Sequence, residues 1–213
     1  MGGHYTKAVF GEFTPPYIHP EYRPVPDDLT PSPLDVYGIT KWAGEQMGMQ
    51  YAREFGLNFL ALRLTTTYGP GKGTDRHGHH GFVSRVIEGA FYGQSVNYER
   101  GREQKNDFVY CKDIAQAVAK AVLASKVPSG SYNIGSGRLA SVEELIKAIK
   151  KRLPNSQIHI GPGLDYYGTG IHHYIWYDIS RAKEEFGYEP RYDLDAGVAD
   201  YLSFLERQQN PVD

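Results

Sequence analysis

The sequence predicts an α/β fold. Along the 213 residues, short segments of strand character alternate with helical segments, which is the order expected when helices pack on a sheet. The continuous apolar run NFLALRL, residues 58–64, is typical of a strand buried on both faces of a parallel sheet. Ser141 and Glu144 have the spacing of a capping box and predict the start of a helix.

The remaining elements follow from local signals. Residues 12–35 are rich in Pro and Asp, which predicts a long loop. A helix is expected from Tyr37 to Phe55, ended by Gly56. Asp113 is expected to cap a later helix. Further strands are expected within 106–110, 131–137 and 156–161, and further helices at 82–92, after 110, and at 142–153, 180–186 and 195–208.

Composition narrows the class of protein. The chain is 40% hydrophobic and 23% charged, as soluble globular proteins are. A formal net charge of -2 argues against general affinity for nucleic acid or anionic membranes, and no apolar run is long enough to span a bilayer. The single Cys111 cannot form an internal disulfide, which fits a reducing cytoplasm. The seventeen tyrosines favour a partly polar pocket or interface.

Tyr37 and Lys41 lie four residues apart in the expected helix and therefore share one of its faces. A free tyrosine has a pKa of about 10 and is a poor base at neutral pH. Lowering that pKa by ~3 units takes about 4 kcal/mol, and a cation roughly 4 Å away at an effective dielectric of ~20 supplies that much. The pair thus predicts a phenolate base. From this motif alone, an interfacial tyrosine beside a solvated lysine stays open.

Five sequence blocks occur in a fixed order around this pair. They are PSPLDVYGITKWAGEQ, LRLTTTYGPG, NDFVYCKDIAQAVAKAV, YNIGSG followed by SVEELI, and YDISRAKEEFGYEP. From about Thr6 to the C-terminus, the chain resembles the extended short-chain dehydrogenase/reductase family, the NAD-dependent nucleotide-sugar epimerases and dehydratases. The set of blocks is specific to that family, whereas no single block is.

The resemblance implies an incomplete Rossmann-like, doubly wound parallel sheet plus a smaller α/β substrate-binding domain. Residues 1–70 and 107–140 would form the remainder of the Rossmann-like domain. Residues 71–106 and 141–213 would form the substrate-binding domain.

The resemblance also implies roles for individual residues. Tyr37 is similar to the family's catalytic base, and Lys41 to its partner at the nicotinamide ribose. Thr6, in TKAVFG, falls at the Ser/Thr position whose hydroxyl bonds the reacting sugar oxygen. Leu64 falls where backbone groups approach the nicotinamide. The implied cofactor is NAD or NADP.

The implied substrate is a nucleotide sugar, yet the substrate positions depart from the family pattern. Thr66 and Asn106 stand where the family has Asn and Arg, and a third family position, usually Arg, is near Gly168. Arg grips phosphate with a rigid fork that Asn cannot replace. The candidate substrate-binding residues are therefore Thr66 and Asn106 with compensating cations at Arg76, Arg102, Lys105 and Lys72.

The family's GxxGxxG turn has no counterpart before Thr6. GSGRLA, residues 135–140, scans as GxGxxA, but no acidic residue lies near Asn155, where a ribose ligand belongs. We interpret it as a tight turn. We therefore expect a C-terminal portion of the family that does not bind NAD by itself. A homodimer through helix 37–55, or a partner chain, would cover its exposed sheet.

Other polar and apolar residues have plainer interpretations. His77, His79 and His80 are expected on a loop over the substrate cleft, with no metal site, and His172 and His173 are treated alike. Asp27 and Asp28 are expected to be solvated loop charges. Trp42 and Met47 are expected to pack in the helix core or at a dimer face.

Two functions remain open. The first is the C-terminal part of an NAD-dependent nucleotide-sugar epimerase or dehydratase, with Tyr37 and Lys41 assisting hydride and proton transfer at a sugar carbon. The second is a non-catalytic, truncated relative that binds a sugar nucleotide or a protein partner.

Overall fold

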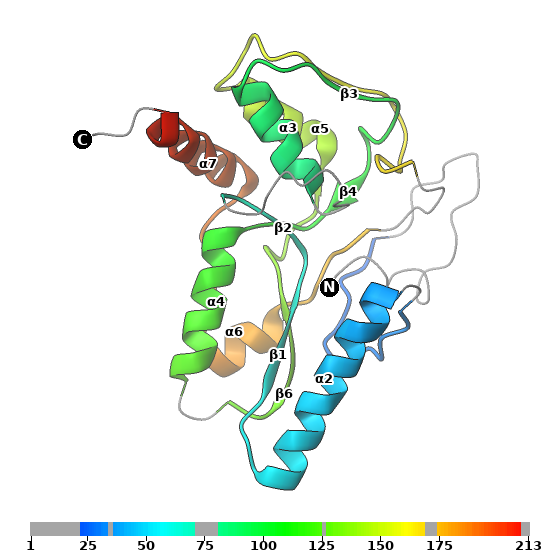
Figure 1. Cartoon of the computed structure of the whole chain (residues 1–213), viewed down its shortest axis with the longest axis vertical. Coiled ribbons are helices and arrows are strands. Elements are labelled where there is room, and N and C mark those ends of the chain that lie inside the picture. The colour runs from blue at the N-terminus through cyan, green and yellow to red at the C-terminus, as the bar shows by residue number, and fades with distance from the viewer. Residues whose placement is uncertain (1–21, 34–35, 71–80, 125–126, 169–173, 210–213) are drawn as a thin grey trace.

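The computed structural model describes residues 22–33, 36–70, 81–124, 127–168 and 174–209. Its helices are α2 (Val36–Phe55), α3 (Phe82–Phe91), α4 (Cys111–Leu123), α5 (Val142–Lys150), α6 (Ser180–Phe186) and α7 (Leu194–Gln209). Its strands are β1 (Leu60–Leu64), β2 (Thr66–Tyr68), β3 (Val96–Tyr98), β4 (Lys105–Asn106), β5 (Phe108–Tyr110), β6 (Gly130–Ile134), β7 (Ala140–Ser141) and β8 (Ile158–Ile160). Figure 1 shows their arrangement. The alternation of strands and helices confirms the predicted α/β class.

The parallel pair β1 and β6 forms the centre of the Rossmann-like part. The register runs from Leu60 opposite Gly130 to Leu64 opposite Ile134. Leucines of β1 and Tyr132 of β6 pack with α4 and α6 around one hydrophobic cluster. Helix α2 lies on the other side of this pair (Figure 1), as expected for a doubly wound sheet.

A second and larger cluster packs α3, α5 and α7 together with β2, β3, β5 and β8. Strands β2 and β5 pair in parallel, as do β3 and β8, whereas β4 and β7 are antiparallel. Helix α6 packs with β1 and β6, although residues 141–213 were assigned to the other domain. The domain boundaries themselves stay a prediction.

Two local expectations were wrong. Leu60, Leu62 and Leu64 are only half-buried, so β1 is not buried on both faces; its buried residues are Ala61 and the charged Arg63. Asp113 does not cap α4, whose N-cap is Tyr110 with no side-chain cap. Both oxygens of the Asp113 carboxylate instead accept backbone N–H groups of the segment before α7, at positions 191 and 192.

The predicted capping box is confirmed: Ser141 accepts from the Glu144 backbone, and the Glu144 carboxylate accepts from the Ser141 backbone N–H. The tyrosines, by contrast, are mostly core residues rather than the lining of a wet pocket. Seven of the largest fully buried side chains are tyrosines. Several of their hydroxyls find partners inside the fold, as Tyr188 does on the Gly135 carbonyl at 2.7 Å and Tyr110 on the Asp200 carboxylate at 2.6 Å. Tyrosine can fill a core when its hydroxyl is satisfied in this way.

Candidate active site at the start of helix α2

Helix α2 runs antiparallel to β1, which follows it in the chain (Figure 1). The two elements touch where the Glu45 carboxylate meets the Arg63 guanidinium. Lys41 lies four residues, about 6 Å along the helix axis, before Glu45, and a strand rises about 3.3 Å per residue. Lys41 is therefore level with the carboxyl end of β1, and Tyr37 lies beyond that end. In open α/β sheets, ligands bind at the carboxyl ends of the strands.

Tyr37 and Lys41 lie together and face solvent. The Lys41 Nζ atom is 5.5 Å from the centroid of the Tyr37 ring, a cation–π distance. The Tyr37 side chain is 42% exposed. The Thr40 hydroxyl donates to the Tyr37 carbonyl at 2.8 Å. Both reactive groups are thus accessible, and the lysine has donors available for a bound molecule.

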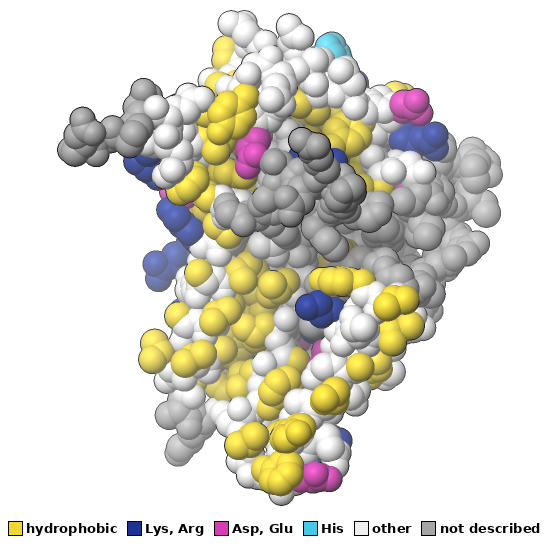
Figure 2. All heavy atoms as spheres, in the orientation of Figure 1, with side chains coloured by type: hydrophobic (Ala, Val, Ile, Leu, Met, Phe, Trp, Pro, Cys, Tyr) yellow, Lys and Arg dark blue, Asp and Glu magenta, His cyan; other side chains and the backbone are white. Residues whose placement is uncertain are grey.

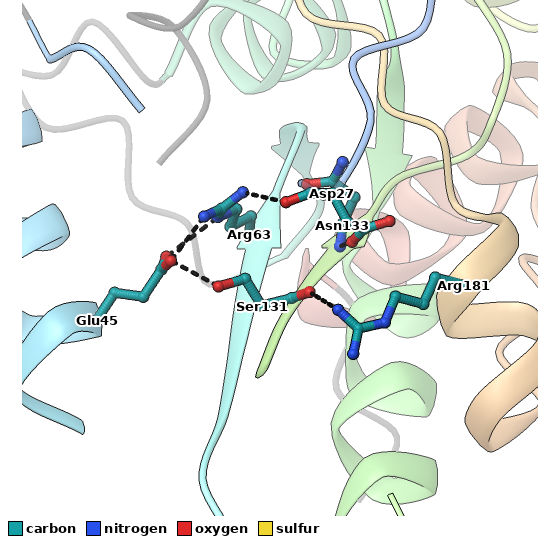
Figure 3. A network of polar contacts seen from close by, with 6 residues as sticks. All are labelled: Asp27, Glu45, Arg63, Ser131, Asn133 and Arg181. Carbon is teal, nitrogen blue, oxygen red and sulfur yellow. Dashed lines mark hydrogen bonds and ion pairs between the residues drawn. The ribbon is translucent and has the colours of Figure 1, made fainter. Parts of the chain in front are cut away.

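A buried polar network joins α2 to β1 and β6 at Glu45, four residues after Lys41 (Figure 3). Arg63 Nη2 and Nε donate to the two oxygens of Glu45 at 2.6 and 3.1 Å. Arg63 Nη1 donates to the Asp27 carbonyl at 2.9 Å, and the Ser131 hydroxyl donates to Glu45 at 2.6 Å. The Arg63 and Glu45 side chains are 7% and 2% exposed. Sequence analysis missed this network because Arg63 sits in an apolar run.

The loop before α2 is fixed by the same network, which corrects the expectation that Asp27 is a solvated charge. Asp27 is half-buried, and its carboxylate accepts the Asn133 backbone N–H. Burial raises the pKa of Asp27 above its ordinary value. Trp42 lies 6.0 Å from the Arg63 guanidinium. Met47, in contrast, is 62% exposed and so does not pack in the core.

Leu64 and Thr66 lie at the carboxyl end of β1, as their proposed roles require. Leu64 ends the strand opposite Ile134, and Thr66 begins β2 opposite Phe108. Thr65 between them is buried, and its hydroxyl has no hydrogen-bond partner among the described residues. Of the other candidates, Thr6, Lys72, Arg76 and the predicted histidine clusters lie outside the described residues.

The other described substrate candidates lie on and around β4. Asn106 is buried, donates to the Tyr166 hydroxyl at 3.0 Å and accepts from the Ile175 backbone at 3.0 Å. Its neighbour Lys105 holds its Nζ atom 5.5 Å from the ring centroid of Tyr22. Arg102 is exposed and donates to the Ile160 carbonyl at 2.8 Å. The amide of Asn106 is thus used within the fold, whereas the two cations lie nearer the surface.

The GSGRLA stretch forms a turn whose backbone donors are occupied. The Ser136 N–H and hydroxyl donate to one oxygen of Asp107 at 2.7 and 2.6 Å, and the Gly137 N–H donates to the other at 3.2 Å. A dinucleotide turn would offer such N–H groups to a pyrophosphate. Here a carboxylate of the chain itself accepts them, so the structure agrees with the tight-turn interpretation.

Two hollows are open on the described surface. One, of about 500 Å³, lies between α3 and β3 and includes Arg85 and Tyr98 in its lining. The other, of about 320 Å³, lies beside the turn after β6 and includes Arg138 and Arg191. The first is within the usual size of small-molecule sites. It belongs to the part of the fold that was predicted to bind substrate.

Comparison with known proteins identifies relatives with the same fold. A putative UDP-glucose 4-epimerase of Methanocaldococcus jannaschii is 31% identical over 199 residues, which cover 93% of this chain and 60% of that protein. A Thermotoga maritima UDP-glucose 4-epimerase, solved with UDP-glucose, aligns with a TM-score of 0.75 at 28% identity, covering 90% of this chain and 60% of that one. This chain therefore spans about 60% of the length of these relatives.

A second solved structure contains both a sugar nucleotide and NAD. The UDP-glucuronic acid 4-epimerase of Bacillus cereus, in complex with UDP-glucuronic acid and NAD, aligns with a TM-score of 0.73 at 26% identity, covering 88% of this chain and 58% of that one. These structures confirm the predicted Rossmann-like fold.

Within the part of the chain that the structure describes, no helix has both the length and the apolar character needed to span a membrane.

The sequence model of the NAD dependent epimerase/dehydratase family matches residues 5–135. The match includes the Tyr37–Lys41 pair, the carboxyl end of β1 and strand β6. The resemblance seen in the sequence blocks is thereby confirmed: this chain belongs to the NAD-dependent epimerase/dehydratase family, within the extended short-chain dehydrogenases/reductases.

Proposed function

We propose that this chain carries the catalytic pair and the sugar-nucleotide-binding part of an NAD-dependent UDP-sugar epimerase or dehydratase. The observation that carries the proposal is the Tyr37–Lys41 pair. The two side chains are in contact, exposed, and lie at and just beyond the carboxyl end of a parallel strand in a chain of this family. The relatives named above are UDP-glucose and UDP-glucuronic acid epimerases.

In the proposed reaction, the Tyr37 phenol oxygen removes the proton from a sugar hydroxyl as the carbon that bears this hydroxyl is oxidised. Lys41, whose ammonium lies 5.5 Å from the centroid of the tyrosine ring, binds a ribose hydroxyl. The bound dinucleotide, NAD or NADP, supplies the hydride acceptor. Leu64 contributes backbone groups beside the nicotinamide, and Thr6 shares the hydrogen bond to the sugar oxygen.

The described residues fit the nicotinamide end of the cofactor better than its pyrophosphate. Tyr37 and Lys41 leave an open face at the end of β1. The N–H groups of the glycine-rich turn after β6, however, donate to the Asp107 carboxylate. We therefore propose that the chain holds the ribose and nicotinamide through α2 and β1, and that the pyrophosphate is bound elsewhere.

For the substrate we propose Arg102 and Lys105 as the cations that meet the diphosphate, together with Arg76. Thr66 and Asn106 occupy positions where the family carries Asn and Arg. Because the Asn106 amide holds Tyr166 and the backbone of residue 175, its proposed contribution is to shape the site. A diphosphate needs positive charge, which Asn106 does not supply.

We further propose that α2 lies at a homodimer interface. Its outward face carries a row of exposed apolar residues, which we call the apolar stripe: Val36, Ile39, Ala43, Met47, Tyr51 and Phe55. Figure 2 shows hydrophobic side chains gathered over the lower part of the molecule, around α4, β1 and the end of α2. Contiguous apolar surface of this kind is typical of interfaces.

A second candidate function is a non-catalytic chain that binds a sugar nucleotide. The observation that favours it is the turn after β6, whose N–H groups are bound by Asp107 and so are not offered to a pyrophosphate. Such a chain would bind UDP-glucose without converting it.

The two functions separate in one assay. The protein is incubated with NAD and UDP-glucose, and formation of the C4 epimer is measured for the natural protein and for Tyr37→Phe. Loss of a general base costs about 10²–10⁴ in rate, so the variant should lose turnover by at least that factor. The matched control is Tyr51→Phe, an exposed tyrosine on the same helix, which should turn over normally.

Other outcomes decide against the enzyme. Saturable UDP-glucose binding without turnover in the natural protein supports the non-catalytic candidate. Equal turnover in the natural protein and in Tyr37→Phe contradicts the role assigned to Tyr37. Circular dichroism of each variant checks that the fold is unchanged.

A further inference from the structure

We propose that the buried Arg63–Glu45 pair is a positioning device that fixes the rotation and height of α2, and thereby the placement of Tyr37 and Lys41. The inference rests on the proposed function, which gives Tyr37 and Lys41 their catalytic roles. It concerns residues that touch neither substrate nor cofactor. Glu45 and Arg63 would act on the reaction only through the helix that they hold.

The first argument is how little else holds α2. Of its 20 residues, Glu45 is the one that is buried. Several of its large apolar side chains point to solvent, with Met47 at 62% and Phe55 at 65% exposed. A helix usually keeps its place by burying an apolar face. This helix also packs Gly48 against the ring of Phe59, but the side chain that it buries is the Glu45 carboxylate, so the contact made by that carboxylate carries much of the positioning.

The second argument is the geometry of the contact. The guanidinium is planar and donates two parallel N–H bonds to the two carboxylate oxygens, at 2.6 and 3.1 Å. Such a bidentate pair fixes direction as well as distance. The Ser131 hydroxyl adds a third bond to Glu45 from β6. An apolar contact would permit sliding and rotation that this arrangement forbids.

The third argument is the spacing along the helix. Tyr37, Lys41 and Glu45 follow each other at four-residue intervals and so lie along the same side of α2. Any rotation of α2 about its axis at Glu45 is passed directly to Lys41 and Tyr37. A misplacement of 1 Å at a reacting group can cost about 10²-fold in rate, so a device that prevents small rotations matters for catalysis.

The same arginine also holds the segment that leads into α2. Its third donor binds the Asp27 carbonyl at 2.9 Å, and Asp27 is tied in turn to the backbone of β6 through Asn133. Figure 3 shows the side chains converging from the loop, α2, β1 and β6. The helix and the loop before it are therefore both bound to Arg63 of β1.

The test measures the position of α2 without requiring turnover. Spin labels are placed on exposed residues of α2 and α4 by Gln46→Cys and Val122→Cys, with Cys111→Ser removing the native thiol. Labelled protein is diluted with unlabelled protein so that only distances within one chain are recorded by pulsed electron resonance. We expect one narrow distance distribution. Arg63→Lys should broaden it or shift its mean by about 1 Å or more.

A second variant separates positioning from stability. The double change Glu45→Met with Arg63→Met replaces the pair by apolar side chains of similar length, which often leaves stability equal or higher. We expect an unfolding midpoint near that of the natural protein and a broadened distribution. The control Glu54→Gln, an exposed carboxylate on the same helix, should change neither. A narrow, unshifted distribution in both Arg63 variants would overturn the proposal.

Turnover provides the catalytic readout. Arg63→Lys should lower kcat by about 10²-fold with KM little changed, and Glu54→Gln should change neither constant. A parallel fall in kcat and in folded fraction would mean that the pair only stabilises the fold, which contradicts the proposal. If the natural protein shows no turnover, the proposed function fails, and the distance measurement still decides whether the pair positions α2.

Discussion

The carboxyl group of Asp107 is completely buried, and burial raises its pKa to about 6 although three hydrogen bonds from the turn after β6 oppose that shift. Its ordinary pKa is about 3.9. Below about pH 4 the group is protonated in both states, and its full contribution to stability is present. That contribution is lost as pH rises through about 6, because the buried group must ionise.

The difference of roughly two pKa units predicts a loss of about 3 kcal/mol of unfolding free energy between about pH 4 and pH 7. Urea unfolding at a series of pH values measures it. Asp107→Asn cannot ionise and places an amide NH₂ where N–H donors converge, so it should be destabilised at neutral pH and should lack this pH dependence. Identical pH profiles for the two proteins would show that Asp107 does not titrate in this range.

Single residues also mark the limit of sequence reasoning. Tyr37 and Lys41 were found from their spacing together with the sequence blocks around them, and the structure brings the two side chains into contact. Arg63 and Glu45 gave no signal, because a strand with one arginine among leucines still scans as apolar. Asp27 was wrongly expected to be solvated because its partners, Arg63 and Asn133, lie 36 and 106 residues away in the chain.

At the scale of elements, local patterns placed α2, α3, α5, α6 and α7 to within a residue or a few. Periodicity and caps are local, which is why they suffice for helices. The pairing of the strands is not local. The outer edge of β6, for example, is closed by side chains: Asp27 accepts from the Asn133 N–H, and Arg181 donates to the Ser131 carbonyl at 3.2 Å. An edge covered in this way resists further pairing.

The packing of α2 gives a prediction with a matched control on the same helix. A Cβ atom at Gly48 would overlap the ring of Phe59, whereas nothing lies within 4 Å of a Cβ at Gly44. Alanine gains about 1 kcal/mol over glycine in a helix, and overpacking costs about 1–3 kcal/mol. Gly44→Ala should therefore stabilise the protein, and Gly48→Ala should destabilise it by about 1 kcal/mol.

Chemical denaturation of the two variants measures this difference, which we expect to be about 2 kcal/mol. The account of α2 packing would be wrong if Gly48→Ala were as stabilising as Gly44→Ala. In that case Phe59 would have moved aside at no cost.

At the scale of the whole molecule, exposed apolar side chains gather on the surfaces of two helices among the described residues. The apolar stripe of α2 is one, and the outer side of α4, with Val118, Val122 and Leu123 exposed, is the other. The family resemblance led us to expect a homodimer through helix 37–55, whereas the sequence offered no partner for the outer side of α4. The proposed dimer would cover the first of these surfaces.

Sedimentation tests the proposed dimer. Met47→Glu places a charge in the middle of the apolar stripe, where burial against a second copy would leave it unpaired. We expect the natural protein to sediment as a dimer and Met47→Glu as a monomer with its fold intact. Gln50→Glu, an exposed position beside the stripe, should remain dimeric. A natural protein that is monomeric at high concentration would contradict the interface.

The central claim is that this chain binds a nucleotide sugar. Calorimetric titration of the folded protein with UDP-glucose tests it most directly, with Lys105→Ala and Arg102→Ala as companions. The account predicts saturable binding that weakens about tenfold when either cation is removed, a change of about 1.4 kcal/mol. Absence of binding in a protein shown to be folded, or equal affinity in all three proteins, would contradict the claim and the site assigned to it.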